Sequence, residues 1–285
     1  MLAIVGTVPD SSFPLSAGNV TLENDNIRIR GREVPVNRGT PALLAAAVMT
    51  GALLGRPAPF ACLAGDIGLG DGSRQLYEYL IQHLDRSDLD TITFHYLQPD
   101  VDWHNRVLFA VENMATRPTL IADAGFMYAA KMSGNSPAYD LFTPDIGELA
   151  FLADEAAPHP FYTRGFILHE ENRVPDLIAR AYAHRNASRF LLVKGKNDCL
   201  ADSNGIIRSI DRPIVEAMEA IGGTGDTITG IVSALIEAGI KIDEAAIIAA
   251  QANRLAGSYA EPNPATRIIE IIHHLPRALE EFSLS

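Results

Sequence analysis

A glycine-rich turn, Gly222-Gly223-Thr224-Gly225-Asp226, stands directly before a helical pattern and offers the clearest chemistry in the sequence. Glycines allow a tight turn with exposed N–H groups, and these add to the positive end of the helix dipole, so the turn can hold a phosphate. Asp226 places a carboxylate in the first turn of that helix. It either complements the dipole or accepts a proton from a substrate hydroxyl while the N–H groups hold a phosphoryl group in transfer.

Acidic residues also follow two other predicted strands. The stretch Thr143-Pro144-Asp145-Ile146-Gly147-Glu148 comes after a short apolar strand, and Pro144 predicts a turn into a helix that holds Glu148 near its start. Asp123 ends another buried strand. Because ligands of open α/β sheets lie beyond the carboxyl ends of the strands, we expect Asp123 to face the same cleft.

A cationic group ends a further apolar run. Lys194 can reach a phosphate as a point charge, and Gly195 permits close approach of the backbone. Segments 199–201 and 206–210 then flank the turn-forming residues Asn204 and Gly205, which predicts a β-hairpin.

The elements that must position these residues alternate along the chain. Helix-length segments with apolar residues three and four apart separate the strand-like runs, and the stripe from Ile228 to Ile236 ends at Gly239. This alternation predicts an α/β layered fold with a mainly parallel sheet. The strand-like runs are Leu2–Val5, Phe60–Ala64, Thr91–Phe94, Thr119–Ala122 and Phe190–Val193.

No repeat, linker or shift in composition divides the 285 residues, so we expect a single domain over 1–285. Near its N-terminus, segments 20–22 and 27–29 flank four turn-forming residues and predict a hairpin around 20–30.

The net charge of the chain limits the kinds of partner that it can bind. Lys and Arg number 23 against 35 Asp and Glu, a formal net charge of −12, which repels nucleic acid and anionic membranes. The longest charge-free stretch, 39–55, is too short and interrupted for a membrane helix, and the N-terminus lacks the basic region of a signal peptide. Cys62 and Cys199 match neither a disulfide framework nor a metal site. We therefore expect a cytoplasmic protein that acts on a small-molecule substrate, and the sequence leaves a homo-oligomer open.

Four stretches together resemble the ribokinase-like superfamily, and within it the ATP- or ADP-dependent NAD(P)H-hydrate dehydratases. They are Gly39-Thr40-Pro41-Ala42 before an Ala-rich helix, Thr143 to Glu148, Lys194-Gly195 with its hairpin, and Gly222 to Gly230. The resemblance spans about residues 39–280. It implies a three-layer sandwich with a mainly parallel central sheet. It also implies Mg²⁺-assisted transfer of a phosphate from ATP or ADP to a hydroxyl, which in the dehydratase branch lies on a hydrated nicotinamide ring and leaves again as phosphate.

The resemblance also implies roles for individual residues. The catalytic base would be Asp226; the anion hole Gly223, Thr224 and Gly225; the nucleotide side Lys194, Gly195, Asn204 and Gly222; the substrate pocket Asp123, Asp145 and Asn37; and the acidic residue that holds Mg²⁺ through water Glu148.

The chain departs from the dehydratase pattern at three points. Asp145 stands where these enzymes usually carry a histidine, Asp123-Ala124-Gly125 replaces an Asp-Ala-Asp, and His95-Tyr96-Leu97-Gln98-Pro99-Asp100 replaces a Gly-Pro-Gly loop. Two alternatives therefore stay open. One is a small-molecule or sugar kinase, and the other is a protein that binds nucleotide without catalysis.

Two weaker signals have structural interpretations of their own. The glycine-rich segment 65–73 misses the spacing of a dinucleotide-binding turn, which leaves a loop with Ser73 as helix N-cap or a loop facing the substrate. His95, Trp103 and His104 are expected in a loop after the third strand, where the tryptophan either packs locally or forms a wall for a planar ring.

Overall fold

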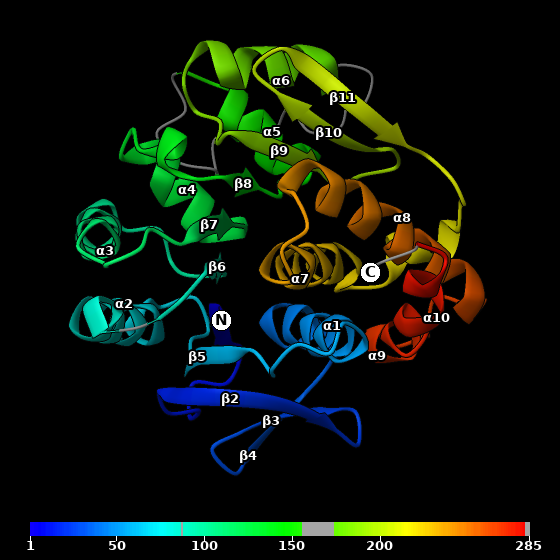
Figure 1. Cartoon of the computed structure of the whole chain (residues 1–285), viewed down its shortest axis with the longest axis horizontal. Helices are drawn as coiled ribbons and strands as arrows, with labels where there is room; N and C mark the ends of the chain where they lie inside the picture. The colour runs from blue at the N-terminus through cyan, green and yellow to red at the C-terminus, as the bar shows by residue number, and fades with distance from the viewer. Residues whose placement is uncertain (87, 156–173, 283–285) are drawn as a thin grey trace.

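The computed structural model describes residues 1–86, 88–155 and 174–282, and its strands form one 11-stranded sheet in the order β11-β10-β9-β8-β7-β6-β1-β5-β2-β3-β4 (Figure 1). The strands are β1 (Leu2–Val8), β2 (Ser16–Glu23), β3 (Asn26–Ile29), β4 (Arg32–Pro35), β5 (Phe60–Gly65), β6 (Thr91–His95), β7 (Thr119–Ala122), β8 (Leu141–Phe142), β9 (Phe190–Val193), β10 (Asp198–Asp202) and β11 (Gly205–Ile210).

The centre of this sheet is parallel. Strand β1 pairs in parallel with β5 and β6, and parallel pairing continues through β7, β8 and β9. Every residue of β1 is buried, because helices cover both faces of the sheet and a parallel strand must then be apolar on both sides. The five apolar runs predicted as strands all lie in these elements, so the α/β fold with a mainly parallel central sheet is confirmed.

Antiparallel strands extend the sheet at both ends. Strand β2 pairs with β5 and with β3, where Val20 lies opposite Ile29. At the other end β10 pairs with β9 and with β11, where Leu200 lies opposite Arg208.

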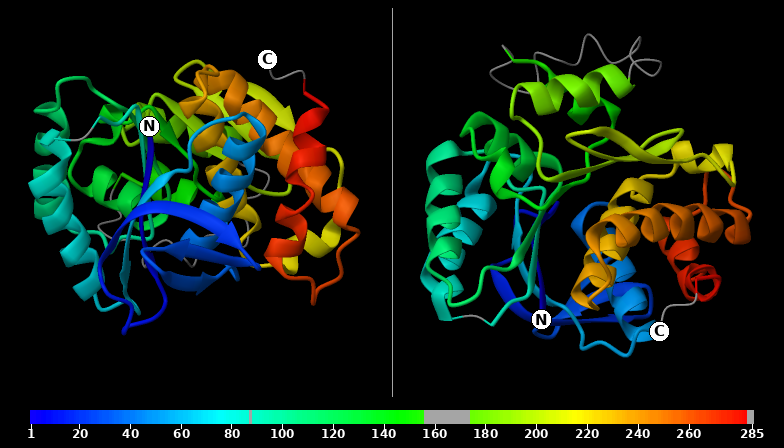
Figure 2. Two further views of the ribbon diagram at one scale, coloured as in Figure 1. Left: turned by 60° about the horizontal axis from the view of Figure 1, so that its bottom comes forward. Right: turned by 45° about the horizontal axis from the view of Figure 1, so that its top comes forward.

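Two sets of helices bury the two faces of the sheet. One hydrophobic core lies under α1, α7, α8, α9 and α10, and the other under α2, α3, α4, α5 and α6, which gives three layers (Figures 1 and 2). The helices are α1 (Thr40–Leu53), α2 (Asp71–His83), α3 (Val101–Glu112), α4 (Ala124–Met132), α5 (Ile146–Ala153), α6 (Val174–Ala183), α7 (Thr224–Glu237), α8 (Ile242–Ala260), α9 (Ile268–Ile272) and α10 (Leu275–Glu280).

Helices α1 and α7 approach each other closely, which sets the position of the glycine-rich turn. A Cβ atom added to Gly230 would stand 2.1 Å from the carbonyl oxygen of Leu43, so only glycine fits at this crossing. The Ala-rich sequence of α1 serves the same purpose, since small side chains let two helices pack at short range.

The expectation that Ser73 caps a helix is wrong. Helix α2 begins at Asp71 with Gly70 as N-cap in the left-handed conformation, at φ 86°. Asp66 explains the difference, because its carboxylate accepts the N–H groups of Gly68, Leu69 and Gly70 and also binds the backbone and hydroxyl of Ser73. The loop is thus closed by one aspartate and ends before Ser73.

The expected loop around Trp103 and His104 is also wrong. Both residues lie in α3, whose N-cap Asp100 accepts the N–H of Trp103. The tryptophan packs parallel to Tyr77, with ring centroids 6.2 Å apart, and so takes the packing role of the two that the sequence allowed.

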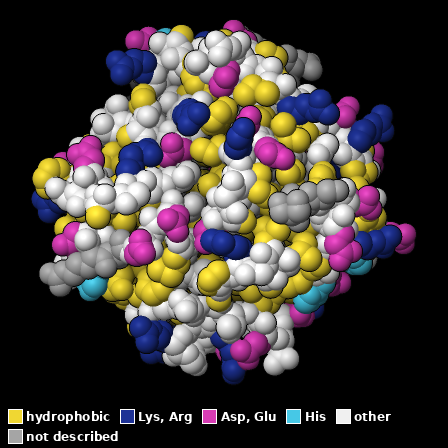
Figure 3. Space-filling view, in the orientation of Figure 1, with side chains coloured by type: hydrophobic (Ala, Val, Ile, Leu, Met, Phe, Trp, Pro, Cys, Tyr) yellow, Lys and Arg dark blue, Asp and Glu magenta, His cyan; other side chains and the backbone are white. Residues whose placement is uncertain are grey.

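The remaining expectations concern the surface charge, a membrane-spanning helix and the two cysteines. Acidic, basic and apolar side chains are interspersed on the face shown in Figure 3. Within residues 1–86, 88–155 and 174–282, every helix is too short or too polar to span a bilayer. Cys62 and Cys199 are free and buried.

Candidate active site

A cavity of about 550 Å³ opens where the carboxyl ends of β6, β7 and β9 meet the starts of α5 and α7. This is the edge at which ligands of open parallel sheets bind. Nine of the residues predicted for the site line the cavity: Asp123, Asp145, Glu148, Lys194, Gly195, Gly223, Thr224, Gly225 and Asp226.

The glycine-rich turn forms the start of α7. Gly223 is its N-cap at φ 101°, a backbone conformation that L side chains rarely adopt, and a Cβ atom there would come 3.0 Å from Ile268. Within the described residues no side chain caps this helix, and the residues of its first turn line the cavity. This geometry is suited to an anion.

Asp226 lies in the first turn of α7 and is held by two other segments. The N–H of Gly39 donates to Oδ2 at 2.6 Å, and His95 Nε2 lies 3.0 Å from Oδ1. Burial favours the neutral acid, but the hydrogen bond and charge of His95, the charge of Lys194 and the Gly39 N–H hold the pKa of Asp226 below its usual range. The carboxylate is therefore ionised at neutral pH and oriented toward the cavity.

His95 lines the cavity although it is not among the site residues predicted from the sequence. It ends β6 fully buried, and its Nδ1 lies 2.9 Å from Thr40 Oγ1, so a chain of hydrogen bonds joins Thr40, His95 and Asp226. The signal in the sequence is a histidine at the carboxyl end of a buried strand, whereas the sequence predicts a loop at this position.

Asp123 and Lys194 form a buried ion pair across the cavity floor. Lys194 Nζ lies 2.8 and 3.0 Å from the two carboxylate oxygens, and Thr229 Oγ1 donates to Asp123 at 2.6 Å. Burial alone would lower the pKa of Lys194, but the charges of Asp123 and Glu148 and the hydrogen bond to Asp123 raise it. Lys194 also touches the helix start, since its Cε would be 3.7 Å from a Cβ on Gly225.

Asp145 and Glu148 form a capping box at the start of α5. The N–H of Glu148 donates to Asp145 Oδ1 at 2.7 Å, the N–H of Asp145 donates to Glu148 Oε2 at 2.8 Å, and Tyr128 donates to Glu148 Oε1 at 3.0 Å. Burial, together with the nearby charges of Asp145 and Asp123, raises the pKa of Glu148. Both carboxylates line the cavity.

Three predicted residues are not brought to the cavity. Asn204 sits in the exposed turn between β10 and β11, where its N–H donates to Asp202. Asn37 is exposed in the segment that joins β4 to α1, and Gly222 is exposed just before the anion-binding turn. Asparagine favours exposed turns for its own backbone hydrogen bonds, which accounts for the signal at Asn204 without a ligand.

Helix α8 supplies two cavity residues that carried no motif. Asn253 Oδ1 accepts from Thr227 at 2.6 Å, and its amide donates to the carbonyl of Thr224 at 3.2 Å. Arg254 Nε lies 2.7 Å from Asp198, and its Nη2 donates to the carbonyls of Gly195 and Lys196. These contacts fix the start of α7 and the turn after β9.

The sheet order and this helix start define the class: the chain has a ribokinase-like fold. Similar folds occur in a ribokinase-like protein of Enterococcus faecalis, at TM-score 0.58, 15% identity and coverage of 100% of this chain and 88% of that one. An ADP/ATP-dependent NAD(P)H-hydrate dehydratase of Bacillus subtilis, co-crystallised with ATP and Mg²⁺, gives TM-score 0.59 at 14% identity, with 99% of this chain and 90% of that chain covered.

The NAD(P)H-hydrate dehydratase family profile matches residues 98–277, and the chain belongs to this family. An uncharacterised protein of Methanocaldococcus jannaschii is 45% identical over 217 residues, which cover 76% of this chain and 89% of that protein. A bifunctional NAD(P)H-hydrate repair enzyme of Hyperthermus butylicus is 39% identical over 110 residues, which cover 36% of this chain and 20% of that enzyme.

Proposed function

We propose that the protein restores hydrated NADH or NADPH by a phosphorylation that consumes ATP or ADP, followed by loss of phosphate. The observation that carries this proposal is Asp226, an ionised carboxylate held by Gly39 and His95 at an open helix start, in a chain of the NAD(P)H-hydrate dehydratase family. A base and a phosphate cradle side by side are what phosphoryl transfer to a hydroxyl requires.

The steps follow from the positions of these groups. Asp226 accepts the proton of the ring hydroxyl while the hydroxyl oxygen bonds to the terminal phosphorus of the nucleotide. The bond between that phosphorus and the rest of the nucleotide breaks. The N–H groups of Gly223, Thr224 and Gly225 bear the charge of the phosphoryl oxygens, and Lys194 lies beside them. The ring C–O bond then breaks, phosphate leaves, and loss of a proton from the neighbouring carbon restores the C=C bond.

A magnesium ion fits the donors at the start of α5. Glu148 and Asp145 offer only oxygens, which Mg²⁺ prefers, and each Glu148 oxygen accepts one hydrogen bond, so a further lone pair remains for bound water. When bound, the ion would neutralise phosphate charge in a cavity whose lining includes seven acidic residues.

Hydrated NADH tests the proposal directly. Incubation with the protein, Mg²⁺ and either ATP or ADP should return the absorbance band of reduced nicotinamide, with one ADP or AMP formed per NADH. Asp226→Asn serves as the inactive control. If no absorbance returns with either nucleotide, the proposal is refuted.

One observation favours a second candidate, a small-molecule kinase. Asp145 and the 95–100 segment depart from the dehydratase pattern on the acceptor side of the cavity, where both Asp145 and Tyr96 line the wall. Formation of ADP with another alcohol, but without any return of absorbance from hydrated NADH, would identify this activity.

A further inference from the structure

Tyr96 has an unusual backbone for its residue type. It follows His95 at the carboxyl end of β6 with φ 50°, in the left-handed region where a bulky side chain is disfavoured. Its carbonyl accepts the hydroxyl of Thr7 at 2.7 Å, which holds the peptide in place. Strained residues of this kind persist only when their surroundings fix them, and they cluster at functional sites.

The strained backbone at Tyr96 lies in the wall of the cavity. Seven non-glycine residues in the described segments have positive φ, and two of them line the cavity: Tyr96 and Ala124, the latter at φ 46° beside Asp123. They follow the neighbouring parallel strands β6 and β7. The other five lie outside the cavity wall, so the two strained positions meet at the site itself.

The ring of Tyr96 stands next to the proposed base. Its centroid lies 4.2 Å from that of His95 at an interplanar angle of 60°, and a Cβ on Gly39 would come within 3.3 Å of its edge. His95 and Gly39 are the two residues that hold Asp226. The ring therefore borders the place where the acceptor hydroxyl must lie.

Much of this ring is free to meet a ligand. Tyr96 is 41% exposed although it lines a cavity, and within the described residues its hydroxyl makes no hydrogen bond. Burial, followed by the charges of Asp226 and Asp123, raises the pKa of Tyr96 to about 12, so the hydroxyl stays a donor at neutral pH. A partly exposed aromatic residue with an unpaired donor suits a ring-bearing ligand that carries a hydrogen-bond acceptor.

We propose that Tyr96 is the platform on which the ring of the acceptor stacks, so that the ring hydroxyl reaches Asp226. The acceptor class is then a cyclic alcohol whose ring can lie against an aromatic side chain, rather than a flexible polyol. This inference rests on the proposed function, because it assigns the acceptor side of the same site.

The test uses NADH, the stable product, which binds without turnover. Calorimetric titration compares wild type with Tyr96→Gly, which removes the ring and suits the left-handed backbone, and with Tyr96→Phe, which keeps the ring. Since stacking of a base on an aromatic ring contributes about 10- to 100-fold in affinity, we expect Tyr96→Gly to weaken NADH binding by that factor. Tyr96→Phe should stay within a few-fold of wild type, and binding of Mg²⁺ and ATP should be unchanged in both.

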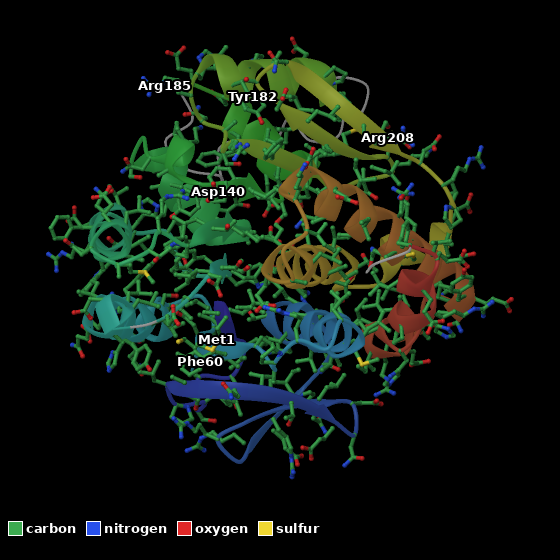
Figure 4. All side chains as sticks on the ribbon, viewed as in Figure 1. Met1, Phe60, Asp140, Tyr182, Arg185 and Arg208 are labelled. Carbon is green, nitrogen blue, oxygen red and sulfur yellow. The ribbon has the colours of Figure 1, made fainter. Side chains whose placement is uncertain are left out.

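A matched control comes from a strained residue elsewhere. Arg185 has φ 58°, is exposed, and lies at the end of α6 away from α7 and β6 (Figure 4). Arg185→Gly should raise the melting temperature by relieving the same strain and leave NADH binding unchanged. If Tyr96→Gly unfolds, Tyr96→Asn replaces it, since asparagine tolerates this conformation without an aromatic ring.

The outcomes separate this inference from the proposed function. Wild-type affinity for NADH in the ringless variant, an equal loss of ATP affinity, or a wild-type protein that does not bind NADH would each overturn the role of Tyr96. A wild-type protein that binds NADH through Tyr96 but does not restore hydrated NADH would refute the proposed function and leave the ring platform standing.

Discussion

Replacing Asp226 by asparagine removes the proposed base while keeping the shape of the site. The amide oxygen can still accept the N–H of Gly39, and the amide nitrogen can face His95 Nε2 if Nδ1 carries the proton toward Thr40. The chain of hydrogen bonds is thus preserved with neutral partners. What is lost is the group that takes the proton.

The size of the effect distinguishes the two roles that the sequence left open. General-base catalysis contributes about 10²- to 10⁴-fold, equal to roughly 3 to 5 kcal/mol in the barrier. An aspartate that only complements the helix dipole contributes about 0.3 to 1 kcal/mol to stability and nothing to turnover. In a chain of this size, about 1 kcal/mol lowers the melting temperature by only some 2 to 4 °C.

Asp71 provides the matched control. It also stands in the first turn of a helix that starts at a left-handed glycine, Gly70, but it does not line the cavity. Turnover of hydrated NADH and melting temperature are measured on Asp226→Asn and Asp71→Asn. We expect a 10²- to 10⁴-fold loss of turnover in the first variant alone. If Asp226→Asn keeps near-wild-type turnover and merely melts a few degrees lower, the aspartate is structural and the proposed mechanism is wrong.

Three further predictions concern the titratable side chains His95, Lys194 and His104. His95→Gln should lower kcat and move the acid limb of the kcat/KM profile to higher pH, because the histidine helps to hold the pKa of Asp226 down. Lys194→Met leaves the Asp123 carboxylate buried without its partner and should cost about 3 to 5 kcal/mol in urea unfolding, part of which Asp123→Asn in the same chain restores. Burial lowers the pKa of His104 to about 4, so between about pH 6.5 and pH 4 the unfolded chain binds a proton that the folded one does not. Stability should therefore fall by up to about 3 kcal/mol over that range as pH decreases, and His104→Gln should flatten the dependence measured by urea unfolding.

The central sheet could be predicted from the sequence because its parallel strands stand out as short apolar runs. Runs such as Phe60–Ala64 and Phe190–Val193 are apolar throughout, which only strands covered on both faces can be. The helix start at Gly222–Asp226 was also predictable, because the left-handed backbone at Gly223 favours glycine. The N-cap of α2 was not, since Asp66 decides it from outside the helix.

The rest of the site depends on long-range contacts that no local pattern encodes. His95 and Asp226 are 131 positions apart in the sequence, and Arg254 and Asp198 are 56 positions apart, yet each pair is within hydrogen-bond distance. In sequence, Arg254 is one polar residue on a long helix, and its role appears only when α8 is laid against the turn after β9. Lys194 shows the same limit in another way, because the sequence predicted a phosphate ligand and the fold gives that ammonium a buried partner, Asp123.

The pairing of Lys194 with Asp123 explains how one cation can serve both stability and binding. The ammonium neutralises a carboxylate that the fold buries, and it lies against Gly225, where the transferred phosphate would sit. Asp226 adds a further negative charge to the same cavity, so Lys194, which is already paired with Asp123, does not balance it. A nucleotide phosphate bound as proposed would enter a net acidic cavity and would need both the helix start and an accompanying cation to be held there. The acidic wall that would repel a bare nucleotide is the same wall that offers oxygen ligands to its magnesium ion.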